Sequence, residues 1–523
     1  MSMFLSSEEL PAGSTLQDYD VCIVGAGAAG LPLAKRLAGS SKKVLVLVAG
    51  LPDEKGLPPS YRQKIYGGTT GDFLTKVDPL FLRRSRLHMF GGTTNHFGFW
   101  SRPLDDADFR ARPGYRDASW PIPLSSLTPY YQDAMDYGRY GPFNFDDLPF
   151  WETTLFGKSF PPKPGDELGV AIMHAQYEER YHDFQLRVAD DLKASSNVTV
   201  LFNAHLLRLD STPDKGHVTA LECASIKKGQ AGHRFRVKAD RYVLALGGIE
   251  TVRVLKLSGD LGNNRRDHLG RGFMVHPLIT TAAKVTFAQP VPAEIRNLYR
   301  DQQVRLRSPE TPGGPYVHDT APLVDPRLLF KHHVFNAWGV LAPKPETLDA
   351  EKIGNFRVIV RFNPEGDKAE LNLNWEQVPN EDSRLTLSAT EVDPVFGQPT
   401  THLDWRLADE DKKTAVRALD LAGHYLTRHG ASDFQLLCDL RGGADEWTFG
   451  RAETALATGD HHMGALRMGA TSEEGLVNVD SRFYSVDNLY TAGCGQFPTS
   501  GFTNPTLTIV ALALRLADHL KAL

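Results

Sequence analysis

Six consecutive residues near the N-terminus have the pattern of an anion-binding turn. Residues 25–30 are Gly-Ala-Gly-Ala-Ala-Gly, so Gly25, Gly27 and Gly30 follow the spacing G-x-G-x-x-G. The first glycine of this pattern permits a tight turn, the second lets the backbone approach a pyrophosphate, and the third lets a helix pack closely on a strand. Amide groups at the start of that helix then face the anionic oxygens. An ordinary glycine turn is the alternative, so the flanking elements must decide between the two.

A pair of histidines, His461 and His462, carries a second possible chemistry. A neutral imidazole can accept a proton from a hydroxyl group, and a pKa near neutral pH suits that task. Adjacent residues point in different directions, so we expect only one of the two rings to face a substrate. The pair could also bind a metal, but no third ligand stands at a familiar spacing, and we expect no metal site.

The elements around the glycine string favour a dinucleotide-binding unit. Residues 20–24 (DVCIV) predict a strand, residues 31–37 have helical spacing, and residues 44–48 (VLVLV) are apolar throughout, as in a parallel strand buried on both faces. This βαβ unit usually ends its second strand with Glu or Asp, which accepts hydrogen bonds from the ribose, but Val48 stands here. The loss of one charged hydrogen bond costs about 1.5 to 3 kcal/mol. Either weak cofactor binding or a different ribose contact follows.

Residues 67–120 are rich in glycine and aromatic residues, and we expect a long functional loop there. Trp100, Tyr115 and Trp120 could stack on a sugar, although buried aromatic side chains more often serve packing. Residues 290–450 alternate predicted strands with one amphipathic helix near residues 412–428, which is typical of an α+β domain.

Composition excludes several classes of protein. The 523 residues are about three times an average domain, so more than one core is expected. The 58 basic and 63 acidic side chains leave a formal charge of −5, which makes nucleic acid an unsuitable partner. Four scattered cysteines without a Cys-x-x-Cys pair indicate a reducing compartment. Without a visible export signal or an apolar stretch long enough to span a bilayer, we expect a cytoplasmic location and no membrane span.

Three further motifs recur together: residues 91–96 (GGTTNH), residues 461–469 (HHMGALRMG) and residues 488–508 (NLYTAGCGQFPTSGFTNPTLT). In this arrangement the chain resembles the glucose-methanol-choline (GMC) oxidoreductase family, nearest to its pyranose oxidase and glycoside 3-oxidase branch. The resemblance also covers residues 244–255 and 269–277, whereas residues 290–375 match little. It implies an α/β FAD-binding Rossmann-like fold with an α+β substrate-binding domain, discontinuous in sequence. The predicted FAD domain comprises residues 15–110, 190–290 and 455–523, and the substrate domain residues 111–189 and 291–454.

The resemblance implies FAD as the cofactor of a flavoprotein. The residues that match its FAD-binding motifs are Gly25, Gly27, Ala28, Gly30, Gly91, Gly92, Thr93, Asn95, His96, Gly247, Gly493, Pro505 and Thr506. At the position of His96 some family members attach the flavin methyl group covalently, while others hold FAD without a bond. Both alternatives stay open, and a covalent link would compensate for the missing acid at Val48.

The family position of His461 is that of the catalytic base, and Asn504 matches a second active-site position that orients the substrate oxygen. We expect Asn504 to cap the last helix and Pro505 to be its first residue, so that the helix amides stabilise negative charge on the reduced flavin. The implied reaction is FAD-dependent oxidation of an alcohol, at C2 or C3 of a sugar or glycoside, with hydride transfer to flavin N5. Dioxygen or a quinone would accept the electrons. Alternatives are the oxidation of a non-sugar alcohol, a lyase on the same fold, and a non-catalytic protein with weakened FAD binding.

Overall fold

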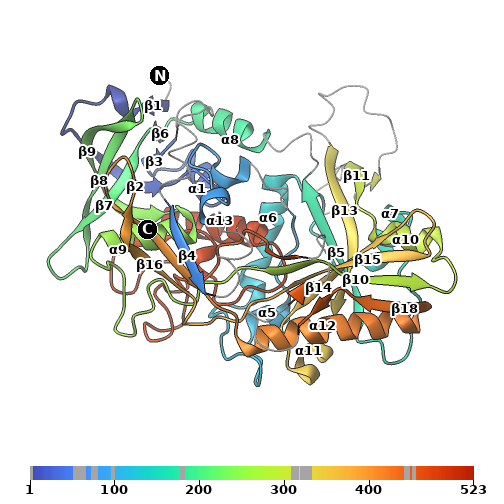
Figure 1. The fold of residues 1–523 in the computed structure, drawn as a ribbon. Helices are drawn as coiled ribbons and strands as arrows, with labels where there is room; N and C mark the ends of the chain where they lie inside the picture. The colour runs from blue at the N-terminus through green and yellow to red at the C-terminus, as the bar shows by residue number, and fades with distance from the viewer. Residues whose placement is uncertain are drawn as a thin grey trace.

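The computed structural model describes residues 4–50, 66–71, 81–95, 100–176, 183–307, 317–318, 332–440, 448–449 and 455–523. Within these residues two large sheets lie on opposite sides of the molecule, and helices pack between and against them (Figure 1). His96 and most of the chain between residues 51 and 80 lie outside the described residues.

The first sheet contains eight strands in the order β1-β6-β3-β2-β9-β8-β7, with β22 paired to β9. Its members are β1 (Phe4–Ser6), β2 (Thr15–Val24), β3 (Val44–Val48), β6 (Val198–Phe202), β7 (His205–Ser211), β8 (Val218–Lys227), β9 (Gln230–Leu244) and β22 (Leu489–Thr491). The central strands are parallel, whereas β8 pairs antiparallel with β9 and β7 pairs antiparallel with β8. Strands from the start, middle and end of the chain therefore share one sheet, which makes the fold discontinuous in sequence.

The predicted βαβ unit is present as β2, α1 (Gly30–Leu37) and β3. All five residues of β3 are buried, because β2 and β6 flank the strand and α1 covers it. Full burial of one Val or Leu side chain contributes about 1.5 to 3 kcal/mol, so an uninterrupted apolar strand is stable only in such a position. The uniformly apolar sequence of this strand thus predicted its place in the sheet correctly.

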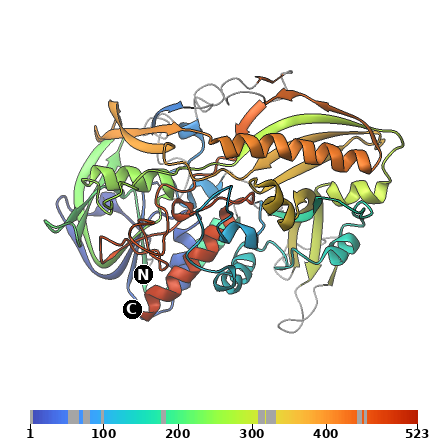
Figure 2. The same cartoon turned by 90° about the horizontal axis from the view of Figure 1, so that it is seen from below.

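The second sheet has nine strands in the order β12-β11-β13-β14-β15-β10-β18, with β5 on β13 and β21 on β10. They are β5 (Leu168–Gln176), β10 (Pro277–Phe287), β11 (Gln302–Arg307), β12 (Val317–His318), β13 (His332–Pro343), β14 (Phe356–Phe362), β15 (Lys368–Trp375), β18 (Ala431–Leu436) and β21 (Ala455–Thr458). The long helix α12 (Asp409–Arg428) lies across this sheet (Figure 2) and contacts β14, β15 and β18. Together they form the expected α+β part. The predicted domain boundaries stay predictions, although β10 and β21 pair with the second sheet.

Helices between the sheets include α13 (Thr506–Ala522), which packs on α1 and on α6 (Thr128–Gly138) (Figure 2). The other α-helices of the described residues are α4 (Phe81–Arg84), α5 (Asp106–Phe109), α7 (Leu148–Thr154), α8 (Asp183–Ala194), α9 (Gly247–Leu257), α10 (Ala293–Tyr299) and α11 (Pro345–Glu351). A two-stranded sheet joins β19 (Cys438–Asp439) to β20 (Thr448–Phe449).

Part of the expected glycine-rich loop is a strand. Residues Tyr66–Gly71 form β4, at the edge of a three-stranded sheet with β16 (Arg384–Val392) and β17 (Pro399–Trp405). β4 runs parallel to β17, and Thr401 stands opposite Tyr66. The pairing partner lies more than 300 residues away in the sequence, so no local pattern of β4 could indicate it. Hydrogen bonds to a distant strand outweigh the low strand propensity of glycine.

Candidate active site

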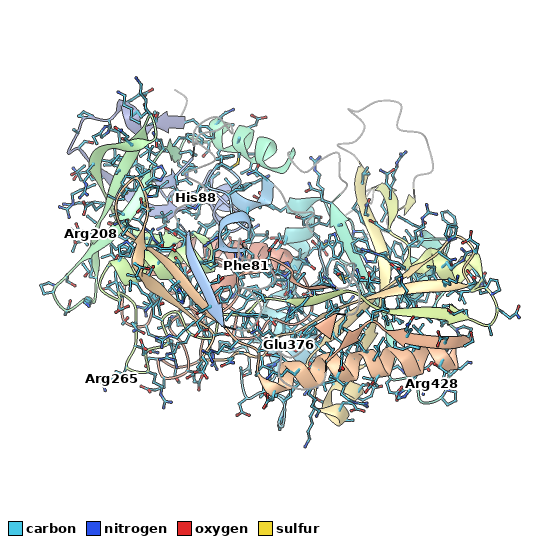
Figure 3. The ribbon with its side chains drawn as sticks, in the orientation of Figure 1. Phe81, His88, Arg208, Arg265, Glu376 and Arg428 are labelled. Atoms are coloured by element: carbon cyan, nitrogen blue, oxygen red, sulfur yellow. The ribbon has the colours of Figure 1, made fainter. Side chains whose placement is uncertain are left out.

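A cavity of about 570 Å³ lies where the glycine turn, the first turn of α13 and the His461 segment meet. Among the residues predicted to bind FAD or to act in catalysis, it is lined by Gly25, Gly27, Ala28, Gly92, Thr93, Gly247, His461, Gly493, Asn504, Pro505 and Thr506. His88, another lining residue, is labelled beside the first sheet in Figure 3. Gly30, Gly91 and Asn95 do not line this cavity.

Two glycines of the turn are needed for close packing. A Cβ atom on Gly25 would lie 2.5 Å from the carbonyl oxygen of Ala245, and one on Gly30 would lie 1.9 Å from the carbonyl oxygen of Gly25. Gly25 also has φ +107°, a conformation that side chains rarely allow. Gly30 therefore brings α1 against β2 and does not itself form the cavity wall.

The second glycine segment packs on the first turn. The amide of Gly91 donates to the carbonyl of Ala26 at 2.8 Å, and a Cβ on Gly92 would lie 3.1 Å from the Cα atom of Gly27. Asn95 closes the segment, since its amide nitrogen donates to the carbonyls of Phe90 and Gly92 at 3.0 and 2.7 Å. The sequence motif at residues 91–95 thus shapes the cavity mainly through backbone contacts.

His461 and Asn504 meet at the cavity although they are 43 residues apart in the sequence. The Nε2 atom of His461 lies 3.2 Å from the Nδ2 atom of Asn504. Within the described residues, the Oδ1 atom of Asn504 is buried without a hydrogen-bond partner. The imidazole of His461 can accept a proton from a hydroxyl group, and the amide of Asn504 beside it can donate a hydrogen bond to the same group.

The charge state of His461 follows from its surroundings. Burial lowers the pKa of His461 well below its ordinary value, and the neighbouring groups His276, Arg357 and His462 further disfavour its protonated form. The imidazole is therefore neutral at neutral pH and able to accept a proton.

His462 also lines the cavity, but its ring has different partners. Its Nε2 atom lies 2.9 Å from the hydroxyl oxygen of Ser85, and its ring meets that of Phe81 edge to face at 5.4 Å. Phe81, on α4, is labelled in the middle of the molecule in Figure 3. His461 lies within hydrogen-bond distance of Asn504 and His462 lies within hydrogen-bond distance of Ser85, so which of the two rings faces a substrate stays a prediction.

The last helix starts one residue later than expected. Pro505 is the N-cap of α13, and the first intrahelical bond runs from the amide of Ile509 to the carbonyl of Pro505. Asn504 is therefore not the cap, and its side-chain amide lies beside His461 instead. The positive end of the helix nevertheless reaches the cavity through Pro505 and Thr506.

The cavity extends to the end of β3, where Val48 is 2% exposed. Sequence reasoning missed a carboxylate on the same wall, Glu250 in the first turn of α9. Its Oε1 atom accepts a hydrogen bond from Arg253 at 2.9 Å, and its Oε2 atom is buried without a hydrogen-bond partner among the described residues. Its position three residues after Gly247, at the start of a helix, was the available signal.

These residues fit a flavin dinucleotide. Gly247 and Gly493 line the cavity, and a Cβ atom on either would meet nothing within 4 Å. The lack of side chains at these two positions therefore leaves open space that a ligand can occupy. Helix amides and a glycine turn provide for anionic groups, and apolar residues such as Leu47 and Ile509 line the cavity beside polar ones such as Arg253. In the described part of the chain, no group of three or more His, Cys, Asp or Glu side chains could hold a metal ion.

Comparison with known proteins identifies the class. Family models described as GMC oxidoreductase match residues 159–278 and 379–513. The 6'''-hydroxyparomomycin C oxidase of Streptomyces lividus is 24% identical over 98% of this chain and 94% of its own. A C-glycoside 3-oxidase of Arthrobacter globiformis is 46% identical over 129 residues, which cover 24% of this chain and 21% of the relative. The crystal structure of pyridoxine 4-oxidase from Mesorbium loti superposes with a TM-score of 0.57 at 18% identity, covering 96% of this chain and 99% of that one.

The sheet arrangement and the cavity define a dinucleotide-binding α/β oxidoreductase fold. The chain belongs to the GMC oxidoreductase family, which confirms the resemblance seen in its motifs. It is an FAD-dependent oxidoreductase that acts on CH–OH groups, as an oxidase or a dehydrogenase. None of the helices in the described residues has the length and apolarity needed to cross a bilayer. The cytoplasmic location stays a prediction.

Proposed function

We propose that the protein oxidises a ring hydroxyl of a sugar or glycoside, at C2 or C3, with His461 as the base. The observation that carries the proposal is the contact of His461 Nε2 with Asn504 Nδ2 at 3.2 Å, on the wall that also contains the start of α13. Bound FAD supplies the hydride acceptor at N5. The residues of the chain supply the orientation and the proton transfer.

His461 takes the hydroxyl proton at Nε2 while the carbon that bears the hydroxyl gives up its hydride, and a carbonyl group forms. The pKa of His461, lowered chiefly by burial, keeps this nitrogen free of a proton before the reaction. Asn504 donates one amide hydrogen to the substrate oxygen as negative charge develops there. The positive end of α13 stabilises negative charge in the same region.

A sugar substrate is supported by the relatives and by the cavity wall. Two relatives bear names that refer to a paromomycin derivative and to C-glycosides. Trp100 lines the cavity, whereas the ring nitrogen of Trp120 donates to the hydroxyl of Thr499 in the interior. Trp100 also meets Trp338 edge to face at 4.9 Å, which holds its indole in one orientation. A rigid indole is a suitable surface for the apolar face of a sugar ring.

Anaerobic stopped-flow mixing with sugars, glycosides and simple alcohols tests the proposal. We expect sugars or glycosides to bleach the flavin absorbance, and the Asn504→Leu variant to slow bleaching about 10²- to 10³-fold. Bleaching by simple alcohols alone would favour a non-sugar substrate. Product formed while the flavin stays oxidised would indicate a lyase, and purified protein without flavin absorbance would indicate a non-catalytic relative. Re-oxidation by dioxygen or by a quinone then identifies the acceptor.

Covalent attachment through His96 is tested separately. After denaturation and removal of small molecules, a covalent bond leaves the flavin mass on the protein, and the His96→Ala variant releases it. Flavin that is released completely from the native protein would exclude the bond.

A further inference from the structure

A second histidine contacts the proposed base, His461, on its Nδ1 side, whereas Asn504 lies on its Nε2 side. His276 directly precedes β10 and is 0% exposed, and both of its ring nitrogens have partners. Its Nδ1 atom lies 2.6 Å from Nδ1 of His461. Its Nε2 atom lies 2.8 Å from the carbonyl oxygen of Gly501 and 3.3 Å from that of Ser500.

Backbone pairing holds the two imidazoles against each other. β10 and β21 are antiparallel, with Pro277 opposite Thr458. The amide of Gly459 donates to the carbonyl of His276 at 2.9 Å, and Met274 and Met463 exchange backbone hydrogen bonds of 2.9 and 3.0 Å. A Cβ atom on Gly459 would lie 2.7 Å from the His461 ring, so this glycine makes room for the imidazole. The contact is therefore part of the sheet framework.

The partners determine which nitrogens carry hydrogen. Carbonyl oxygens only accept, so Nε2 of His276 must donate. In a neutral ring its Nδ1 atom is then an acceptor, and Nδ1 of His461 must donate to it. A neutral His461 with hydrogen on Nδ1 has its lone pair on Nε2, the nitrogen that faces the Asn504 amide at 3.2 Å.

This placement of hydrogens holds only when His276 is neutral. Burial lowers the pKa of His276 to about 4, with Arg357 adding to the effect and Glu376 opposing it. Protonation of His276 would place a cation against His461, so His276, like Arg357 and His462, acts to lower the pKa of His461. A cationic His276 would donate from both nitrogens and force the hydrogen of His461 onto Nε2, where no proton could be accepted.

We propose that His276 is a positioning residue that holds His461 as the Nδ1–H tautomer, with Nε2 unprotonated toward the substrate. Nothing in the motifs of His461 or Asn504 assigns this role to residue 276. The inference deepens the proposed function and rests on it only for the use of His461 as a base. The tautomer itself can be measured without turnover.

The test is ¹⁵N NMR of the holoenzyme labelled with [¹⁵N]histidine, with the signals of His461 assigned by their loss in the His461→Ala variant. We expect the native protein at neutral pH to show a protonated Nδ1 and an unprotonated Nε2 for His461. In His276→Phe, which keeps a ring but removes both nitrogens, we expect a mixture of tautomers. A native His461 with hydrogen on Nε2 would overturn the proposal.

Kinetics provide the second readout. We expect His276→Phe to slow anaerobic flavin reduction at least 10²-fold with little change in substrate affinity, because misassigned tautomers in other His-dependent enzymes cost up to about 10⁴-fold. His276→Asn keeps an acceptor near Nδ1 of His461 and should restore most of the rate. His174→Asn is the matched control, since His174 is also fully buried and bonded to a carbonyl, that of Tyr140.

The outcomes separate the two proposals. If the native His461 has the Nδ1–H tautomer but no alcohol reduces the flavin, the proposed function fails and the role of His276 in setting the tautomer stands. If alcohols reduce the flavin and His276→Phe leaves both the tautomer and the rate unchanged, the positioning role fails alone. A His276→Phe variant that does not fold leaves the native spectrum and His276→Asn to decide.

Discussion

Residue 461 combines a common side chain with an unusual environment. An exposed histidine would be partly protonated near neutral pH, whereas burial and three nearby nitrogen-containing side chains lower the pKa of His461. One of these side chains is Arg357, a buried residue of β14 whose guanidinium carbon lies 5.3 Å from the Trp100 ring centre. Arg357 thus lowers the pKa of the proposed base and also contacts Trp100, the side chain proposed to bind the sugar.

At this scale we predict the pH dependence of flavin reduction. A base works only when unprotonated, so a lowered pKa keeps the rate constant across neutral pH and moves its acid decline far below the ordinary histidine pKa of about 6.5. The Arg357→Met variant loses a positive charge, so the pKa of His461 rises and the decline moves to higher pH. Arg357→Lys, which keeps the charge, is the control. Anaerobic reduction rates from acid to neutral pH measure both, and a native decline centred near 6.5 would contradict the prediction.

At the scale of elements, two glycines of the motif at residues 25–30 in the βαβ unit have different structural roles. Gly30 carries the contact between α1 and β2, whereas Gly27 lines the cavity and has its nearest neighbour at 4.0 Å from a built Cβ atom. Stability and cofactor binding can therefore be changed independently within four residues.

We predict that Gly30→Ala lowers the unfolding free energy of the apoprotein, whereas Gly27→Ala lowers the affinity for FAD. Gly30→Ala places Cβ 1.9 Å from a backbone oxygen, so α1 must shift and the apoprotein loses about 1 to 3 kcal/mol of unfolding free energy. Gly27→Ala leaves the unfolding free energy near the native value but weakens FAD binding, because a methyl group enters the cavity. Denaturant unfolding of apoproteins and FAD titration measure the two effects. Equal destabilisation by both substitutions would be inconsistent with this division.

The end of β3 provides another element-scale prediction. We expect Val48→Glu to strengthen FAD binding by about 1.5 to 3 kcal/mol, the value of a charged hydrogen bond. Val48→Thr, which has a similar volume and no charge, should leave affinity unchanged. Affinity is measured by titrating apoprotein with FAD. If Val48→Glu binds FAD no better than the native protein does, the ribose has another partner on the cavity wall. Glu250 is a carboxylate that lines this cavity.

Across the whole molecule, one buried carboxylate joins the loop after α5 to the second sheet. Glu376 directly follows β15 and forms ion pairs with Arg112 and with Arg116, the latter at 3.0 Å. It also accepts the amide of Asn355 at 2.9 Å. Figure 3 labels Glu376 near one end of α12, with Arg428 at the other. The cluster links chain segments that are more than 200 residues apart.

We predict that Glu376→Gln lowers the unfolding free energy by about 3 to 5 kcal/mol, because two arginines keep their buried charge without a carboxylate. Burial acts to raise the pKa of Glu376, but Arg112 and Arg116 outweigh it, so the folded pKa is lowered. The contribution of Glu376 is therefore complete above the unfolded pKa of about 4.3 and is lost as pH falls through the folded value. Denaturant unfolding at neutral and acid pH measures this, with exposed Glu365→Gln as the control. A difference between native and variant that is the same at both pH values would contradict it.

Local sequence determined the features whose cause lies within a few residues. The glycine turn and the doubly buried β3 could be predicted because spacing and uniform burial act over short distances, whereas the role of His461 comes from the family resemblance and stays a prediction. Tertiary structure alone decided the contact of His276 with His461, which are 185 residues apart, and the strand β4 on its distant partner. It also turned Asn504 from the expected helix cap to a neighbour of His461. These features depend on which strands pair and in what register, and that is set by burial and hydrogen bonding across the whole chain.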